Sequence, residues 1–254
     1  MKYYEQLIDK GCFTRSDVVE LTGNGDTANS LIYSYKRKGY IDSVRRDMFV
    51  AISLETKQPI PTRYSIASHI AKGAYITLHS AFEYYGYANQ VYYEVYVAAK
   101  TRFREFQYDG IIYRYVQPAI DSGVVKMGDG VNITDIERTV LDSINIFEKI
   151  GGLEETLRCI ELVPYLDYSK LLRYMAYYNK GYLYQRVGYL LKRYQDILKL
   201  PDSFFSVCKR LAPDTKRYLY HELLLEPHIF DDEWRLYVPN NLSAVIDKGA
   251  AYIE

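Results

Sequence analysis

Residues 14–52 constrain the fold more than any other part of this sequence. Thr14 and Asp17 form a capping-box pattern, which predicts a helix that begins at the residue after Thr14. We expect this helix to end near Thr22, because the glycine-rich residues 23–25 tolerate the positive φ angles of a helix end. A short helix that stops at such a turn is the first half of a helix-turn-helix.

A second helix and a hairpin are predicted to complete this unit. Asp26 or Thr27 is expected to cap the helix, which should end at about Lys38. Residues 40–52 alternate around Arg45–Asp47, a pattern typical of a β-hairpin with those residues at its tip. Helix, tight turn, helix and hairpin in this order describe a winged helix-turn-helix, a unit that reads DNA. The buried stripe of the second helix is predicted at helical spacing: Ala28, Leu31, Ile32 and Tyr35.

The opposite face of the second helix is predicted to contact DNA. Its side chains are hydrogen-bonding and cationic groups, which suit base edges and phosphates in a major groove. The hairpin tip adds two arginines on the same side. The predicted DNA-binding residues are Thr27, Asn29, Ser30, Tyr33, Lys36, Arg37, Arg45 and Arg46.

The charge of the chain allows a local interface with nucleic acid but no general one. Lys+Arg and Asp+Glu both number 32, so the formal net charge is zero. Affinity for phosphates must therefore come from a patch. From Tyr33 to Arg46 there are five Lys/Arg and one acid, Asp42, which leaves a local excess of four positive charges. Cations near a helix end would offset the helix dipole in any protein, but that does not account for the arginines of the hairpin.

We expect two domains and an α+β fold class. Residues 1–10 form an amphipathic pattern that predicts a helix completing a three-helix core. Pro59 and Pro61 indicate an extended linker. We therefore predict a winged helix-turn-helix domain over residues 1–57 and a mixed α/β domain with a helical C-terminal part over residues 62–254.

The second domain is predicted from local signals. Val91–Ala99 is rich in β-forming residues and predicts a central strand, and Asp109-Gly110 predicts a hairpin turn within residues 104–116. Thr134 and Glu137 form a second capping-box pattern. We also expect short strands over 124–133, helices over 63–72, 77–86 (capped by Thr77), 153–162, 168–178, 182–198 and 201–211, and strands or extended pieces over 221–225 and 235–238.

Tyrosines and cations alternate along the two helices predicted over 168–178 and 182–198. One interpretation is a partner-binding surface, because these residue types are enriched at interface hot spots. Its members would be Arg173, Tyr177, Lys180, Arg186 and Arg193. The alternative is a helix pair that buries its leucines and exposes the remaining side chains to solvent. RNA and a protein partner both suit such a surface.

No pattern predicts a catalytic, cofactor or metal site. His79 and Ser80 are adjacent and point to different helix faces, so we interpret them as a packing or capping pair. A metal-dependent nuclease requires an acid and a closely following Glu/Asp-x-Lys, but Glu94 is followed by a lysine only at Lys100. Turn or cap contexts account for Asp109, Asp129 and Asp135. We predict a protein that is not an enzyme, with a metal-dependent nuclease as the less favoured alternative.

The cysteines and the hydropathy pattern bear on the compartment. Cys12, Cys159 and Cys208 are odd in number and lack metal-type spacing, which favours a reduced, cytoplasmic setting. No apolar run approaches the roughly 20 residues of a membrane span. We expect no membrane partner.

Three motifs together resemble one known family. The first is the Phe13-Thr-Arg-Ser-Asp-Val opening with the Lys38-Gly-Tyr-Ile and Val-Arg-Arg ending of the N-terminal unit. The second is GAYITLHSAFEYYG at residues 73–86, and the third is ITDIERTVLD at residues 133–142, with Gly151-Gly152 further on. In this order, over roughly Tyr3 to Leu198, the chain resembles the AbiEi antitoxin family of bacterial abortive-infection systems.

The resemblance implies a protein with two activities. The N-terminal domain of such proteins binds inverted repeats in its own promoter and represses the operon. The C-terminal domain counters a co-encoded nucleotidyltransferase toxin. The implied partners are double-stranded promoter DNA and a cognate toxin. The alternatives are a stand-alone winged-helix transcriptional regulator and a docking protein.

Overall fold

A computed structural model describes residues 2–240 and 242. Within them the fold is α+β, with eleven α-helices and short strands in mixed sheets. The chain divides into two compact units. Unit 1 comprises Met1–Ile76, Tyr93–Gln117 and Lys126–Asn132, and unit 2 comprises Thr77–Tyr92, Pro118–Val125 and Ile133–Glu254. The boundary predicted between residues 57 and 62 lies within unit 1 and stays a prediction. Residues 241 and 243–254 of the predicted second domain lie outside the described residues.

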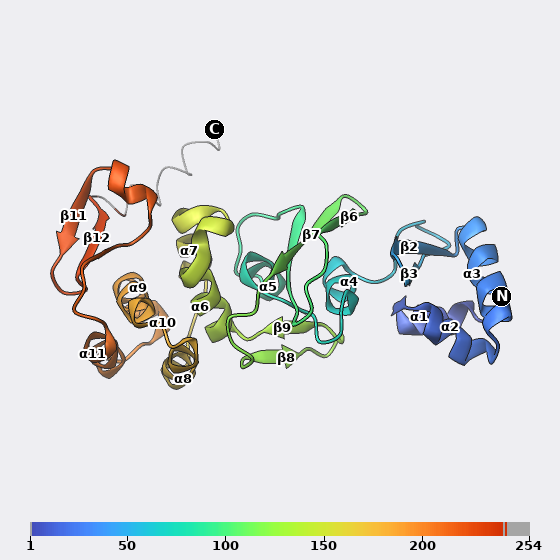
Figure 1. Ribbon diagram of the computed structural model, residues 1–254, viewed down its shortest axis with the longest axis horizontal. Helices are drawn as coiled ribbons and strands as arrows, with labels where there is room; N and C mark the ends of the chain where they lie inside the picture. The colour runs from blue at the N-terminus through green and yellow to red at the C-terminus, as the bar shows by residue number, and fades with distance from the viewer. Residues whose placement is uncertain (1, 241, 243–254) are drawn as a thin grey trace. The chain divides into compact units, whose positions relative to one another are not determined.

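Three helices and a small sheet form the N-terminal part of unit 1 (Figure 1). The sheet has the strand order β1-β3-β2, and both pairings are antiparallel. Apolar residues of the helices and strands share one core, which includes Leu7, Val18, Ala28 and Tyr35. Leu31 and Ile32 are partly buried and pack against this core, as the predicted stripe requires. The elements are α1 (Tyr4–Lys10), β1 (Cys12–Phe13), α2 (Arg15–Thr22), α3 (Gly25–Arg37), β2 (Ile41–Arg45) and β3 (Met48–Ala51).

The start of α2 confirms one predicted cap, and the start of α3 corrects another. Thr14 and Asp17 form the reciprocal capping box, with the Thr14 backbone N–H donating to Asp17 at 2.7 Å. The prediction that Asp26 or Thr27 caps α3 is wrong. Asn24 has an extended backbone that aims its Oδ1 at the N–H groups of both residues, at 2.8 and 3.0 Å. The helix therefore begins at Gly25.

A second sheet region of unit 1 follows α4 (Arg63–His69). Four of its strands have the order β6-β7-β5-β4, where β5 and β7 are parallel and the outer pairs are antiparallel. The predicted hairpin turn is confirmed, because Asp109 and Gly110 both have positive φ, at 48° and 77°. The strands are β4 (Tyr75–Ile76), β5 (Glu94–Ala98), β6 (Phe106–Tyr108) and β7 (Ile111–Val116), with β8 (Val124–Lys126) and β9 (Asn132–Thr134) later in the chain.

Unit 2 is mainly helical and holds the largest apolar core. A small sheet of order β10-β12-β11 lies in its C-terminal part, with β10 parallel and β11 antiparallel to β12. The helices are α5 (Leu78–Tyr85), α6 (Ile136–Ile146), α7 (Gly152–Glu161), α8 (Tyr168–Tyr178), α9 (Gly181–Lys192), α10 (Gln195–Leu198) and α11 (Asp202–Leu211). The 3-10 helices are η1 (Phe147–Lys149) and η2 (Glu222–Leu225), and the strands are β10 (Arg217–Tyr218), β11 (His228–Asp231) and β12 (Leu236–Pro239).

Two caps of unit 2 differ from the prediction. Thr77 stands at the N-cap position of α5, but its hydroxyl donates to Asp142 Oδ2 at 3.2 Å instead of capping the helix. The cap of α6 is Asp135, which accepts from the Arg138 N–H at 2.9 Å. Thr134 does not cap α6, because it is the last residue of β9 and its hydroxyl pairs with Thr139.

Two helix predictions in the C-terminal half also need correction. The helix predicted over 182–198 is divided into α9 and α10, since Tyr194 leaves the helical conformation between them. Residues 221–225, predicted as a strand or an extended piece, contain the 3-10 helix η2 instead. The strand at 236–239 agrees with the predicted extended piece.

Candidate nucleic-acid interface

A surface hollow of about 550 Å³ lies where α2, α3 and the β2–β3 turn meet. Four of the predicted DNA-binding residues line it: Asn29, Tyr33, Lys36 and Arg46. Tyr33 is 69% exposed, which is unusual for a large aromatic side chain. The hollow therefore places hydrogen-bonding, aromatic and cationic groups on one accessible surface.

Arg15 joins the three elements of this hollow, and the sequence analysis missed it. Its Nε donates to Asn29 Oδ1 at 2.7 Å, and its backbone N–H donates to Asp47 Oδ1 at 2.9 Å. The first bond fixes the side chain of Asn29 on α3. The second fixes the β2–β3 turn, where Asp47 has a positive φ of 56°. Asn29 also lines the hollow, and its Oδ1 is the atom that Arg15 binds.

The cations around the hollow have no acidic partner within residues 2–240. Lys36, Arg37, Lys38 and Arg46 are exposed, and none forms an ion pair with an acidic side chain of the described residues. Asp47 is the one acid that lines the hollow, and it accepts from the backbone of Arg15. Other cations differ, since Arg114 binds Glu94 at 2.6 Å and Arg138 binds Asp142 at 2.8 Å. The α3 surface thus keeps its positive charge.

The remaining predicted DNA-binding residues lie outside this lining. Thr27, Ser30 and Arg37 are exposed on α3. Arg45 is only partly exposed and turns toward the protein: its guanidinium lies over the rings of Phe103 and Phe106, 5.9 and 5.4 Å from their centroids. Its Nη1 atom is buried. Arg46 is therefore the exposed arginine of the hairpin turn.

Of the five residues predicted to form a partner surface in unit 2, three are exposed and two are partly buried. Arg173, Tyr177 and Arg193 are exposed, and 56% of Tyr177 is accessible. Lys180 and Arg186 are partly buried. Lys180 Nζ lies 3.5 Å from Asn145 Oδ1, and Arg186 lies over the Phe147 ring and binds Glu148 at 3.4 Å. These two cations therefore fasten the helices of unit 2 to each other.

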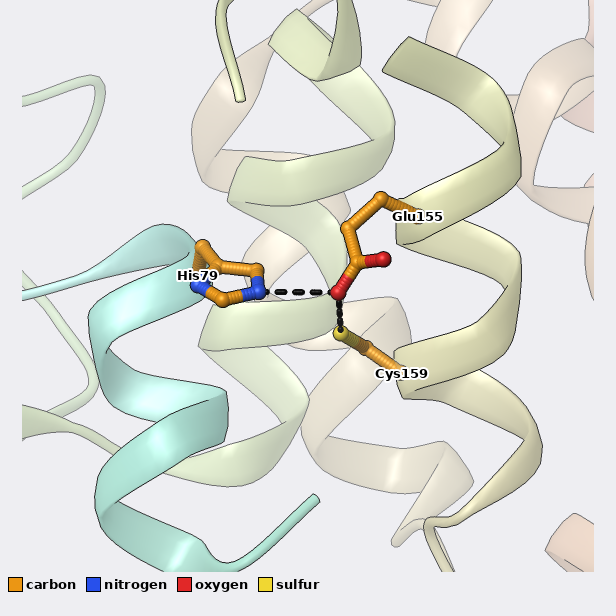
Figure 2. Close-up of side chains that lie close together, drawn as sticks. All are labelled: His79, Glu155 and Cys159. Atoms are coloured by element: carbon orange, nitrogen blue, oxygen red, sulfur yellow. Dashed lines mark hydrogen bonds and ion pairs between the residues drawn. The ribbon is translucent and has the colours of Figure 1, made fainter. Parts of the chain in front are cut away.

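Unit 2 also contains a buried polar cluster that the sequence analysis did not predict. Figure 2 shows the His79 ring, from α5, pointing at the Glu155 carboxylate, from α7, with Cys159 next to it. The Nε2 of His79 lies 2.9 Å from Glu155 Oε1, and the Cys159 thiol lies 3.5 Å from the same oxygen. On its other side the ring has Glu83 Oε1 3.3 Å from Nδ1 and stacks on Tyr92. The spacing of four residues between His79 and Glu83 was the available sequence signal.

The cluster is an ion pair that also offers metal-ligand atoms. Burial lowers the pKa of His79, but its bonds to Glu155 and Glu83 outweigh this, so the pKa lies above its ordinary value. Burial raises the pKa of the Cys159 thiol. The ligand atoms of His79, Glu155 and Cys159 lie within 4.8 Å of one another, a donor set of the type that Zn²⁺ takes. A structural zinc site uses four ligands, and this cluster offers three. The hydrogen bonds of His79 and Cys159 to Glu155 already account for the positions of the three side chains.

The acids required by the nuclease alternative have structural partners. Glu94 accepts from Arg114 and Tyr96, and its bond to Arg114 lowers its pKa. Asp135 caps α6 and accepts from Tyr174 at 2.7 Å.

The segment 133–142 forms a buried ion network. Arg138 is 1% exposed; its Nε donates to Asp142 Oδ2 at 2.8 Å and its Nη1 to the Ile120 carbonyl at 3.0 Å. Asp142 also accepts from the hydroxyl of Tyr178. This motif therefore joins α6, α8 and the chain before β8, which is a structural role.

Comparisons with known proteins give a fold and no family. No family model matches the chain, and no curated protein matches it. Among solved structures, the RV2827C protein from Mycobacterium tuberculosis has a similar fold, with a TM-score of 0.64 and 13% sequence identity. The match covers 98% of this chain and 94% of that chain. At this identity the likeness concerns the fold alone. In the described part of the chain, no helix is both long and apolar enough to cross a membrane.

Proposed function

We propose that this chain is a DNA-binding antitoxin and transcriptional autorepressor of a toxin–antitoxin operon. In this proposal α2 and α3 are the helix pair of a winged helix-turn-helix, and the β2–β3 hairpin is its wing. The observation that carries it is the hollow of Asn29, Tyr33, Lys36 and Arg46, whose cations have no acidic partner in the described chain. An exposed positive surface beside a polar helix face suits a DNA duplex.

Some residues of the interface would contact phosphates, and others would contact bases. Lys36 and Arg46 are exposed cations that line the hollow, so they would contact phosphates, which position the protein without reading sequence. Asn29 is held by Arg15 and presents an amide, which pairs well with adenine in a major groove. Ser30 lies next to it on the exposed face.

Fluorescence anisotropy with the duplex upstream of the gene tests the DNA-binding half of this proposal. Lys36→Ala should weaken binding to all sequences alike and reduce the slope of log K against log salt by about 0.9. Asn29→Ala should instead lower the preference for the operator over a scrambled duplex by roughly 5-fold or more. Arg210→Ala, an exposed arginine on α11, is the matched control. Failure of the wild-type chain to bind at low salt would remove the DNA-binding claim.

The antitoxin half rests on the resemblance to the AbiEi family, and the toxin would be a nucleotidyltransferase-like enzyme. The neighbouring open reading frame tests it: this frame should encode a nucleotidyltransferase-like enzyme, and growth is measured when that enzyme and this chain are co-expressed. The wild-type chain should restore growth, and Lys36→Ala/Arg46→Ala should restore it equally while derepressing the promoter. Persistent growth arrest with the wild-type chain would contradict the antitoxin assignment.

A second candidate is a docking protein or a stand-alone regulator. The exposed side chains of Arg173 and Tyr177 on α8 favour docking, because such residues are frequent at interface hot spots. A docking protein would leave promoter activity unchanged in Lys36→Ala/Arg46→Ala. A stand-alone regulator would repress its promoter but would not protect cells from the toxin.

A further inference from the structure

The β2–β3 hairpin packs against the segment between β5 and β6, and against the start of β6, in the same unit. The Arg45 guanidinium covers Phe103 and Phe106, and its Nη1 atom is buried. Phe103 is itself buried and packs edge-on against Phe106 and Tyr115. A cation over two aromatic rings that are themselves packed is a stabilising contact. The arginine of the hairpin thus holds the turn beside this segment.

Two further arginines flank Phe103. Arg102 and Arg104 are exposed on either side of the buried Phe103. Arg102 lies over the Tyr115 ring, 5.8 Å from its centroid. Neither arginine forms an ion pair with an acid of the described chain, whereas the neighbouring Glu105 is held by Arg114 at 2.9 Å. The segment therefore presents two positive charges next to the hairpin turn.

We propose that Arg102 and Arg104 contact DNA phosphates beyond those reached by the hairpin turn. The interface would then run from α3 through Arg46 into the β5–β6 segment. This inference rests on the proposed DNA-binding function and extends it to residues outside the predicted domain 1–57. The partner is a B-form duplex, since the contacts are exposed cationic side chains, which need only regularly spaced phosphates.

The salt dependence of binding isolates these contacts. Each lost phosphate contact lowers the slope of log K against log salt by about 0.9, so Arg102→Ala/Arg104→Ala should lower it by about 1.8. Between 50 and 200 mM salt, wild-type affinity should therefore fall about 12-fold more than that of the double variant. The preference for operator over scrambled duplex should not change. Arg102→Lys/Arg104→Lys should keep the wild-type slope, because lysine also neutralises a phosphate.

The control variant removes two positive charges from unit 2 instead of from unit 1. Arg210→Ala/Lys216→Ala deletes one exposed cation without a ring contact and one that lies over the Phe230 ring, matching Arg104 and Arg102. It should keep the wild-type slope. An unchanged slope in Arg102→Ala/Arg104→Ala, in a chain that binds DNA and keeps its circular dichroism spectrum, would overturn this inference and leave the proposed function intact. Absence of wild-type binding would overturn both.

Discussion

The Nε2 atom of His79 lies 2.9 Å from Oε1 of Glu155, and both side chains are buried although they are 76 positions apart. The pair joins α5 to α7. The bonds of His79 to Glu155 and Glu83 raise its pKa above 6.5 against the opposing effect of burial. The pKa of Glu155 is lowered below 4.5, because its bond from His79 outweighs burial. Folding stability should therefore depend on pH through this pair.

The pair should contribute most at mildly acidic pH. The contribution of His79 is complete below its unfolded pKa of 6.5 and is lost as pH rises through the folded value. That of Glu155 is complete above 4.5 and is lost as pH falls. His79→Leu leaves a buried carboxylate without its partner, so urea unfolding at pH 5.5 should show a loss of about 3–5 kcal/mol, and a smaller one at pH 8.5. His221→Ala, at an exposed histidine, should be neutral at both. Equal losses at the two pH values would refute the ion pair.

The three cysteines should be unreactive in the folded chain. All are buried, and burial raises the pKa of Cys12 and of Cys208 to about 12. Because the thiolate is the reactive species, a chromogenic disulfide reagent at pH 8 should label none of them rapidly. In guanidinium chloride it should label all three. Rapid labelling of the native chain would show that the thiol of at least one cysteine is accessible.

Gly188→Ala should displace the single tryptophan. A Cβ atom at this position would lie 2.0 Å from the Trp234 ring, which is buried against α9. Overpacking of this kind costs about 1–3 kcal/mol, and more where the neighbour cannot move. We expect a red shift of the tryptophan emission and a lower Tm. Gly128→Ala meets no atom within 4 Å and should change neither.

Arg138 and Asp142 should behave as a coupled pair. Arg138→Met leaves the buried Asp142 carboxylate without its cationic partner and removes the donor to the Ile120 carbonyl. We therefore expect the free energy of unfolding to fall by about 3–5 kcal/mol. Arg138→Met/Asp142→Leu should lose less than the sum of the single variants, since no uncompensated charge remains. Chemical denaturation of the three variants measures the coupling. Additive losses would contradict it.

Four of the nine residues that line the hollow were predicted as DNA-binding residues from local sequence patterns. The spacing along residues 26–38 identified the exposed face, and Asn29, Tyr33, Lys36 and Arg46 line one hollow. Arg15 could not be found in this way, because its side-chain partner is 14 positions away. The direction of Arg45 depends on Phe103, in the segment before β6, and on Phe106, the first residue of β6.

The sequence by itself determined the features that depend on residues close to each other along the chain. The Thr14–Asp17 box, the Asp109-Gly110 turn and the bounds of α8 follow from residues within a few positions of each other. Tertiary structure decided the rest, because buried polar groups bind partners wherever the fold brings them. Thr77 therefore donates to Asp142, 65 positions away, instead of capping its helix, and His79 pairs with Glu155, 76 positions away.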